Sequence, residues 1–361
     1  MRTLLALALT VWLSWAAVLW GAEDQAGKPL ESEQVSLGAA VFHVVFSPDG
    51  KTLGAGGEGR IGLWRLAEGN RRTILASGDR FTSLAFSGDG AVLAAGEHCN
   101  PDVPDGVHPG RVQLREVATG KLLWQRQVKY PATSVALSPD GKTLVYALSG
   151  GEIVFWDVPG KRELSRAKHE GTVSLRFSHS GQVLASACDT PEPHFLPRRG
   201  ADGRPIGPIA RGQAADGSIR LWNATTGRIV RTLSQKSSEG VNSIAFSTDD
   251  RILAAGYHDA KMRVWDAERG KLLHTLKVHS APAWALPVAF SSGGKLLASG
   301  SYNDDFLRLW DTQAGKPLSS VRAGRITTLS ISVDGRTVAT ADCNDSRGTV
   351  RLWNMSLLHK Q

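Results

Sequence analysis

Short apolar runs recur along this chain, and each ends in a polar turn before further apolar residues follow. The run precedes a Ser-x-Asp-Gly turn, or a close variant of it, seven times, ending at Phe46, Phe86, Leu137, Phe177, Phe246, Phe290 and Ile331. The next apolar group ends at Trp64, Arg115, Trp156, Trp222, Trp265, Trp310 and Trp353. A pattern repeating at roughly forty residues predicts an array in which no unit buries its apolar faces alone.

Four short strands are expected in each repeat, and the fifth repeat shows them most clearly. They run from Val241 to Phe246, Ile252 to Gly256, Met262 to Trp265 and Leu272 to Leu276. Strands of this length between Gly, Asp and Asn turns predict an antiparallel meander. Blades that pack face to face around an axis bury both faces of their middle strands. The expected fold class is therefore all-β, a seven-bladed β-propeller of four-stranded antiparallel blades.

The two ends of the repeat region predict how the ring closes. The sequence stops soon after Trp353, which leaves too little for a fourth strand in the last repeat. Gly27 to Leu30 echoes Gly315 to Leu318, the lead into a fourth strand, and Glu33 to Leu37 then alternates like one. We expect this N-terminal strand to close the ring, because the last blade would otherwise leave an unpaired edge.

The first residues differ in kind from the repeats. Arg2 precedes an uncharged, mostly apolar stretch from Leu4 to Ala22, and Glu23 and Asp24 then open a polar segment. A basic start, an apolar centre and small residues near its end predict an export signal. The stretch is also long enough to span a bilayer uncut. Residues 1–22 are therefore interpreted as a signal peptide or a signal anchor, with a buried hydrophobic terminus in a cytoplasmic protein as the third interpretation.

This interpretation divides the chain and places it in the cell. Residues 23–32 become a linker, and residues 33–361 form the propeller. The protein is expected to be exported to the periplasm or the extracellular space. In the alternative, residues 4–22 anchor it in a membrane.

Three Trp-Asp pairs make the chain resemble the WD-repeat family of β-propellers, as an exported bacterial-type member. The pairs are Trp156-Asp157, Trp265-Asp266 and Trp310-Asp311, with near-matches at Trp222-Asn223 and Trp353-Asn354. The resemblance covers nearly everything from about Glu33 to Asn354, and Arg115-Glu116 in repeat two departs from it furthest. It implies a propeller that mediates protein assembly.

The resemblance also implies a structural network of a His before strand one, a Ser or Thr of strand two, a turn Asp and the Trp. In repeat six these are His279, Ser299, Asp304 or Asp305, and Trp310, while His169, Ser186 and Trp222 match in part in repeat four. The other repeats lack the His, so packing must hold them. The residues given a structural role are Trp64, Trp156, Trp222, Trp265, Trp310, Trp353, His279 and Ser299.

The formal charge of +8 raises the question of a nucleic-acid partner. Many basic residues stand at recurring turn positions, as Lys51 and Lys142 do, with Asp49 and Asp140 beside them in the same turns. Charge dispersed over repeats differs from the clustered footprint of phosphate binding. We expect no nucleic-acid partner.

The residues expected to face the ring centre are almost all small and neutral, namely His43, Ser83, Ser134, Ser174, Ser243, Pro287 and Thr328. A metal centre needs several convergent ligands, so neither a metal nor a cofactor is expected. No Ser-His-Asp set, carboxylate pair or phosphate-binding Gly loop stands out, so no catalytic residue is assigned. The three cysteines Cys99, Cys188 and Cys343 fall in separate repeats, expected to be too far apart for disulfides.

Two of the links between second and third strands are long, at about 97–110 and 189–217, whereas the link around Ser149 to Gly151 is short. Long loops on rigid scaffolds carry recognition more often than minimal connectors do. Both insertions should rise on one face and flank a cleft over the short link. Their Pro and Gly content also fits a partly disordered surface insertion. The candidate partner-binding residues are His98, Asn100, Asp105, His108, Phe195, Arg198, Arg199 and Arg204.

These patterns favour a non-catalytic protein-binding scaffold in the periplasm or at the cell envelope, expected to be a monomeric propeller. The alternative is a periplasmic propeller enzyme of hydrolase or lactonase type that acts at the channel mouth. A nucleic-acid binder is the third class, and export argues against it. A metal site at His98, Cys99 and His108 is disfavoured because no fixed spacing supports it.

Overall fold

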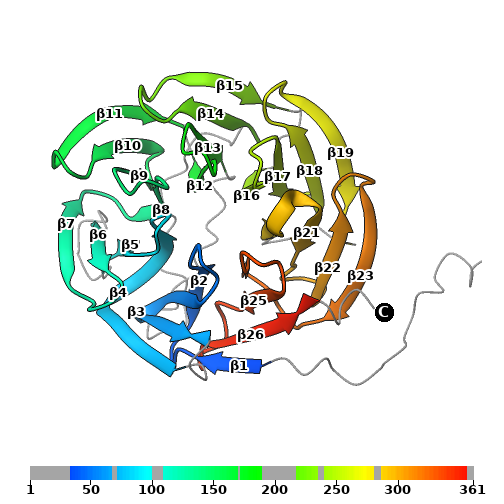
Figure 1. Ribbon diagram of the computed structural model, residues 1–361, viewed down its shortest axis with the longest axis horizontal. Helices are drawn as coiled ribbons and strands as arrows, with labels where there is room; N and C mark the ends of the chain where they lie inside the picture. The colour runs from blue at the N-terminus through cyan, green and yellow to red at the C-terminus, as the bar shows by residue number, and fades with distance from the viewer. Residues whose placement is uncertain are drawn as a thin grey trace, which may run out of the picture. The chain divides into compact units, whose positions relative to one another are not determined.

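Antiparallel sheets built from successive repeats stand around a central axis in the unit Ser32–Gln361 (Figure 1). The computed structural model describes residues 33–66, 71–99, 109–169, 171–188, 217–234, 240–279 and 286–355. Met1–Glu31 forms a separate unit, so the predicted signal segment and nearly all of the predicted linker belong to it and lie outside the described residues.

Repeats three to five each form one four-stranded sheet whose strands follow one another in chain order. Repeat three supplies β8 (Ala132–Leu137), β9 (Thr143–Leu148), β10 (Glu152–Asp157) and β11 (Arg162–Lys168). Repeat four supplies β12 (Thr172–Phe177), β13 (Val183–Cys188), β14 (Ile219–Asn223) and β15 (Ile229–Leu233). Repeat five supplies β16 (Val241–Phe246), β17 (Ile252–Tyr257), β18 (Lys261–Asp266) and β19 (Lys271–Lys277). The four strands predicted in repeat five are thus confirmed to within one residue at each end.

Repeats six and seven form two further four-stranded sheets. Repeat six supplies β20 (Val288–Phe290), the 3-10 helix η2 (Ser292–Gly294), β21 (Leu296–Ser299), β22 (Phe306–Asp311) and β23 (Lys316–Arg322). Repeat seven supplies β24 (Thr328–Ile331), β25 (Thr337–Ala341) and β26 (Thr349–Asn354). The fourth strand of that sheet is β1 (Glu33–Ser36), which lies beside β26.

Repeats one and two differ from the expected separate blades because they share one six-stranded sheet. Its strands are β2 (Val41–Phe46), β3 (Thr52–Arg65), β4 (Arg71–Phe86), β5 (Val92–His98), β6 (Gly110–Glu116) and β7 (Leu122–Val128). The strands β3 and β4 continue through positions where the chain turns between two strands in the other repeats. Glu58 of β3 pairs with Arg80 of β4 in this extended part. The guanidinium of Arg80 also lies 3.5 Å from the Glu58 carboxylate. One continuous strand, β4, therefore serves both repeats.

The N-terminal strand joins the first residues of the ring to the last. Along β1, the pairing with β26 runs from Glu33 opposite Leu352 to Ser36 opposite Thr349. The backbone contact continues past the strand, because Leu37 N donates to the carbonyl of Gly348 at 3.0 Å. Leu37 is fully buried. This strand thus supplies both backbone hydrogen bonds and apolar packing to repeat seven.

The hydrophobic core lies between neighbouring sheets. One cluster joins Val241 and Trp265 of repeat five to Leu221 and Leu233 of repeat four. Another joins the first repeat to the last and contains Val41, Leu53, Trp64, Ala339 and Val350. Full burial of one large apolar side chain contributes on the order of 2–3 kcal/mol. Because these clusters span two repeats, neighbouring repeats stabilise each other.

The Ser-x-Asp turns owe their recurrence to a local hydrogen-bond pattern. In repeat one, the Ser47 hydroxyl donates to Asp49 at 2.5 Å and accepts from Thr52 N at 2.9 Å. The same carboxylate accepts from Lys51 N at 3.0 Å. The equivalent Ser and Asp bond each other in four further repeats, at Ser87 and Asp89, Ser138 and Asp140, Ser247 and Asp249, and Ser332 and Asp334. The turn fixes the hairpin between first and second strands.

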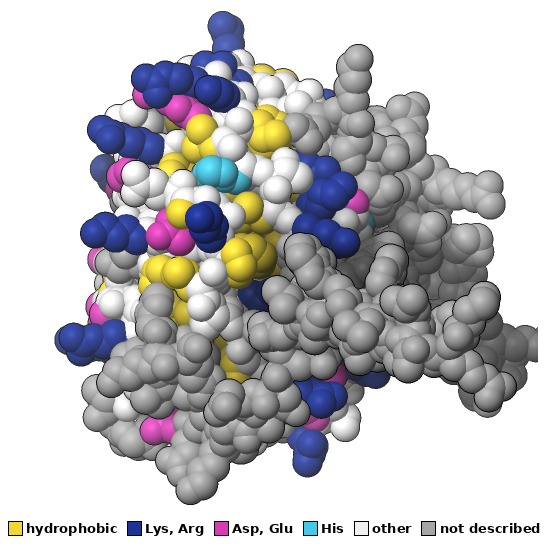
Figure 2. All heavy atoms as spheres, turned by 90° about the vertical axis from the view of Figure 1, so that its right-hand side faces the viewer, with side chains coloured by type: hydrophobic (Ala, Val, Ile, Leu, Met, Phe, Trp, Pro, Cys, Tyr) yellow, Lys and Arg dark blue, Asp and Glu magenta, His cyan; other side chains and the backbone are white. Residues whose placement is uncertain are grey.

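The outer surface carries mixed charge. Figure 2 shows Lys and Arg side chains spread over one side of the molecule, with Asp and Glu side chains among them and apolar side chains between. Exposed apolar residues lie on outer strands, as Leu273 does on β19 and Leu318 on β23. Among the described residues, none forms a helix with the length and apolar character that a membrane crossing requires.

Candidate functional site

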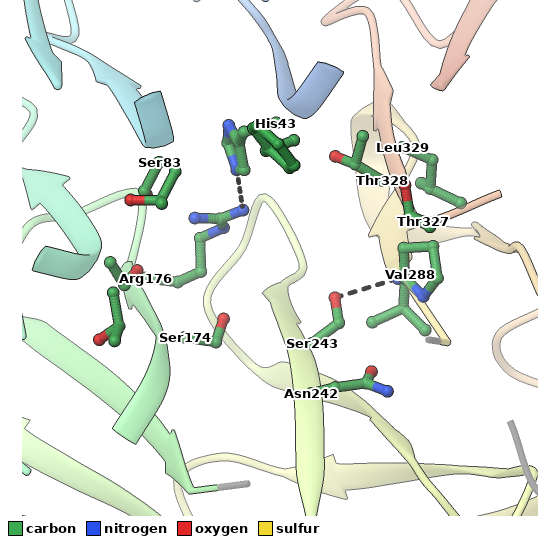
Figure 3. A pocket seen from close by; sticks show the side chains of 15 residues that line it. His43, Ser83, Ser174, Arg176, Asn242, Ser243, Val288, Thr327, Thr328 and Leu329 are labelled. Carbon is green, nitrogen blue, oxygen red and sulfur yellow. Dashed lines mark hydrogen bonds between the residues drawn. The ribbon is translucent and has the colours of Figure 1, made fainter. Parts of the chain in front are cut away.

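The innermost strands of the sheets enclose a cavity of about 180 Å³ at the centre of the ring (Figure 3). All seven residues predicted to face the centre line it, which confirms that part of the sequence analysis. The complete lining is Phe42, His43, Thr82, Ser83, Thr133, Ser134, Ser174, Arg176, Asn242, Ser243, Pro287, Val288, Thr327, Thr328 and Leu329.

The small hydroxyl residues of this ring link one repeat to the next. Ser83 Oγ accepts from Val135 N at 3.1 Å, and Ser134 Oγ accepts from Leu175 N at 3.0 Å. The same bond joins Val288 N to Ser243 Oγ at 3.1 Å and Val44 N to Thr328 Oγ1 at 3.2 Å. The last of these connects repeat seven to repeat one. These bonds explain the recurrence of Ser and Thr at this position, which His43 and Pro287 occupy in two other repeats.

A charged residue that the sequence analysis did not predict lies in the same cavity. Arg176, the second-last residue of its inner strand, donates from Nη1 to its neighbour's carbonyl, Leu175 O, at 3.1 Å. Its Nη2 lies 3.3 Å from His43 Nε2 across the ring. The seven predicted residues stay small or neutral, and Arg176 adds a charge that the sequence analysis did not predict. The missed signal was in the repeats themselves, because the equivalent positions hold Val45, Ala85, Ala136, Ala245, Ala289 and Ser330.

The surroundings of His43 fix its charge. Burial and, to a smaller extent, the positive charge of Arg176 together lower the pKa of His43 to about 3. The imidazole is therefore neutral at ordinary pH. Since Nε2 faces the guanidinium, which can only donate, Nε2 is the acceptor and Nδ1 carries the proton. Burial also lowers the pKa of Arg176, yet a guanidinium stays protonated in proteins.

The His, Ser and Trp of repeat four form a joined network. Trp222 Nε1 donates to Ser186 Oγ at 2.8 Å, and Ser186 Oγ lies 2.7 Å from His169 Nδ1. His169 Nε2 lies 3.2 Å from Ser218 Oγ, at the foot of the long link that precedes β14. Ser186 thus connects the Trp to the His, as the family resemblance implied for these three residues.

In repeat six the corresponding residues form two separate hydrogen-bonded groups. Trp310 Nε1 donates to Ser299 Oγ at 2.9 Å, while His279 Nδ1 bonds the carboxylate of Asp304. Among the described residues no hydrogen bond joins His279 to Ser299, so the expected single network is divided. Asp304 is the partner, not Asp305, which lies 3.7 Å from Arg322. Burial lowers the pKa of His279 and outweighs the opposing effect of the Asp304 carboxylate.

The repeated Trp residues are all buried, with exposed fractions between 2% for Trp64 and 9% for Trp156. Trp353 Nε1 donates to Thr340 Oγ1 at 2.8 Å, which is the counterpart in repeat seven of the Trp–Ser bond. In repeat two, Arg115 takes the place of the Trp and donates to Gln113 Oε1 at 2.6 Å and to Gly120 O at 2.9 Å. The remaining Trp residues of the set are Trp222, Trp265 and Trp310.

The predicted partner-binding residues fall almost entirely outside the described residues. His98, the exception, is the half-buried last residue of β5 and pairs with Gly110 and Arg80. Cys99 N donates to Pro109 O at 3.1 Å, so the long link of repeat two leaves and re-enters its sheet at one place. The other seven lie outside the described residues, namely Asn100, Asp105, His108, Phe195, Arg198, Arg199 and Arg204.

The three cysteines of the chain are all free thiols. Cys99 and Cys188 are buried free thiols, and Cys343 is a half-buried one. Within the ranges that the structure describes, no group of three or more His, Cys, Asp or Glu side chains is placed to hold a metal ion.

Two family models match the second half of the chain. Residues 270–311 and 315–354 match the model described as WD domain, G-beta repeat. Residues 209–286 match the model described as Anaphase-promoting complex subunit 4 WD40 domain. These matches show WD40 repeats in this part of the chain, and proteins built from them are generally non-enzymatic interaction scaffolds.

A solved structure extends the likeness to nearly the whole chain. A chain of the "Crystal Structure of Mitotic Checkpoint Complex" matches with a TM-score of 0.68, over 92% of this chain and 94% of that chain. The sequences are 18% identical, so the likeness shows the fold alone. The fold is all-β and corresponds to a WD40 propeller. The exported, bacterial-type part of the sequence resemblance stays a prediction.

Proposed function

We propose that the protein is a closed seven-bladed WD40 propeller that acts as a non-catalytic scaffold for protein partners. The pairing of β1 with β26 and the bond from Val44 N to Thr328 Oγ1 support ring closure. Strands from all seven repeats, with repeats one and two sharing β4, support the number of blades. This scaffold needs no metal or cofactor, and it is a monomer.

The observation that carries the binding role is the unequal length of the links at one face. β9 ends at Leu148 and β10 begins at Glu152, whereas β13 ends at Cys188 and β14 begins at Ile219. The link from His98 to Gly110 is also long. Links between second and third strands emerge at the same end of each meander, so the two long links flank the short one of repeat three.

A partner would bind between the two long links, over residues 149–151. His98, Asn100, Asp105 and His108 lie in or next to one link, and Phe195, Arg198, Arg199 and Arg204 lie in the other. Phe195 with Arg198 and Arg199 combines the apolar and cationic character that is common in interface anchors. A rigid ring beneath such loops keeps their bases at fixed positions, which favours a defined recognition surface.

Loop deletion tests this role. Shortening residues 190–215 to a tight turn should leave the melting temperature nearly unchanged, because surface links bury little core, and should abolish partner capture from native envelope extract. Shortening residues 101–108 is the matched control on the other long link. Phe195→Ala tests the Phe195 side chain alone. Unimpaired capture by the folded 190–215 deletion would place the binding site elsewhere.

The same proposal places the protein in the periplasm or at the cell envelope, free after cleavage or held by residues 4–22. A C-terminal reporter that works only outside the cytoplasm should be active on the full chain and inactive after removal of residues 1–22. A cytoplasmic signal from the full-length fusion would refute export. The N-terminal residue of the mature protein decides between cleavage and anchoring, and light scattering of the purified protein checks that it is a monomer.

A further inference from the structure

Side-chain donors outnumber acceptors around Arg176 in the central cavity. A guanidinium has five N–H donors, and the hydrogen bonds of Arg176 reach only Leu175 O and His43 Nε2 among the described residues. His43 Nδ1 and Asn242 Nδ2 are buried and have no hydrogen-bond partner within the described part of the chain. Buried donors without acceptors cost free energy. Arg176 therefore has more donors than its two acceptors can use, and the cavity beside it lacks a further acceptor among the described residues.

The hydroxyl groups around the cavity add to this surplus. Ser83, Ser134, Ser243 and Thr328 each use a lone pair to accept a backbone N–H from the next repeat. A hydroxyl can accept and donate at the same time. None of the hydrogen bonds found for these four residues uses the hydroxyl proton, so it stays available to a group in the cavity.

The charge of the cavity has one sign. Arg176 is the sole charged residue among the fifteen described residues of the lining, which include neither Asp nor Glu. Its side chain keeps part of its surface open to the cavity, and Figure 3 shows it reaching toward His43 across the open centre. Moving a guanidinium out of bulk water without a counter-charge is unfavourable. An anion with several oxygen acceptors would supply both the charge and the missing acceptors.

We infer that the central cavity is a binding site for a small oxyanion, a carboxylate or phosphate group held by Arg176 with the ring hydroxyls. The planar guanidinium matches both groups through paired parallel hydrogen bonds. A volume of about 180 Å³ accommodates one such group on a small molecule or on a side chain. None of the described lining residues belongs to the two long links, and the inference does not depend on the proposed scaffold function.

The oxyanion can come from two sources, a free small anion or an acidic side chain of a bound protein. Thermal melts with sodium phosphate, with sodium succinate and with a Glu-containing hexapeptide address both. Each is compared with sodium chloride at equal ionic strength, because general screening also affects melting. A ligand that binds only the folded protein raises the melting temperature with its concentration. Isothermal calorimetry with the same probes gives the dissociation constants.

Arg176→Ala is the decisive variant, since Ala stands at the equivalent position in repeats two, three, five and six. It should fold and lose at least tenfold in affinity for the probe that binds. Arg231→Ala is the matched control, because Arg231 is exposed on β15 and its loss changes the net charge by the same amount. His43→Ala removes the acceptor that holds Arg176 Nη2 in place and should weaken binding by a smaller factor.

The outcomes separate the sources and can overturn the inference. Binding of phosphate or succinate that Arg176→Ala abolishes and Arg231→Ala retains identifies a free anion as a ligand. Binding of the acidic hexapeptide alone, with the same dependence on Arg176, identifies an acidic group of a protein. If no probe stabilises the wild-type protein beyond sodium chloride, or if Arg176→Ala binds as well as wild type, Arg176 is only a hydrated cation and the inference is wrong.

Discussion

The carboxylate of Asp250 in repeat five accepts two hydrogen bonds from the backbone beside His179 in repeat four. One oxygen lies 2.6 Å from His179 N and the other 2.8 Å from Ser180 N. Asp250 has a positive φ of 61°, at the turn position where repeat one has Gly50 and repeat three has Gly141. Since this conformation is unfavourable for a residue with a side chain, the cross-sheet bonds offset a local strain.

Replacing Asp250 should therefore have two opposing effects. Asp250→Gly relieves the positive φ and removes both hydrogen bonds, and we expect a net loss of about 1 kcal/mol in the free energy of unfolding. Asp250→Asn keeps one acceptor oxygen and tolerates the backbone conformation, so its loss should be smaller. Urea unfolding measures both. A glycine variant more stable than wild type would show that the strain outweighs the bonds.

The junction between β1 and repeat seven can be tested at Gly348. This residue has a φ of 64°, and an added Cβ would lie 1.9 Å from the carbonyl oxygen of Ala39. We expect Gly348→Ala to destabilise the protein by about 2 kcal/mol or more, because the backbone must shift where Leu37 N bonds Gly348 O. Gly150→Ala is the control, since its added Cβ would stay 3.8 Å from Tyr130.

Truncation tests the same junction from the other strand. Removal of Glu23 to Gly38 should lower the melting temperature of the whole ring, because the last sheet loses β1 and exposes an edge. The comparison is with a protein that begins at Glu23. Equal midpoints would reassign residues 33–37 to a free linker.

The bond from Val135 N to Ser83 Oγ predicts the cost of breaking an inter-repeat contact in the cavity. Ser83→Ala leaves the buried N–H of Val135 without its acceptor, which should cost about 1–2 kcal/mol. Ser149→Ala changes an exposed residue of the same type and should cost little. Chemical denaturation of the two variants gives the difference. Equal stabilities would mean that water replaces the hydroxyl.

Ser186 and Ser299 should differ in importance although both bond a Trp. Ser186 Oγ joins Trp222 to His169, whereas Ser299 Oγ bonds Trp310 in the divided arrangement. We expect Ser186→Ala to cost about 2 kcal/mol and Ser299→Ala about 1 kcal/mol, because the first leaves two buried groups unpaired. Unfolding curves recorded under identical conditions check the order. A reversed order would contradict the assigned networks.

The Ser-x-Asp turns predict the response of the protein to acid. Hydrogen bonds from the neighbouring Ser hydroxyl, followed by those from backbone N–H groups, lower the carboxyl pKa in four of the five turns. In the fifth, at Asp249, the Ser hydroxyl again has the largest lowering effect. The pKa values of these Asp carboxyls in the folded protein therefore lie below the unfolded value of about 3.9. The stabilisation is complete above that pH, and it is lost as the pH falls through the folded pKa values. The residues concerned are Asp49, Asp89, Asp140, Asp249 and Asp334.

Melting temperatures recorded from neutral pH down to about pH 2 should show this loss. Each turn is largely exposed, so each contributes little, and the effect is a sum over five repeats. A variant with Asn at Asp49, Asp140 and Asp334 should melt lower at neutral pH and lose less between pH 5 and 3 than wild type. Identical pH profiles for both proteins would contradict the assignment.

Regular features of the fold could be predicted because they repeat. The Ser-x-Asp turns and the buried Trp residues recur, and the strands expected in repeat five match β16 to β19 closely. Single deviations could not be predicted with the same rule. Arg176 stands at a position that is small elsewhere, so an argument from the common pattern passed over it. The choice of Asp304 over Asp305 depends on side-chain placement, which adjacent positions in a sequence do not reveal.

The pairing of β1 with β26 has a consequence for the order in which the chain is made. Glu33 leaves the ribosome long before Leu352, which lies opposite it in the sheet, is synthesised. At about 5–20 residues per second, the interval is on the order of tens of seconds. During that time Val35 and Leu37 have no finished sheet to cover them. A neighbouring chain that offers its own last repeat in this interval competes with β26 for the strand, so crowded synthesis raises the risk of an exchanged dimer.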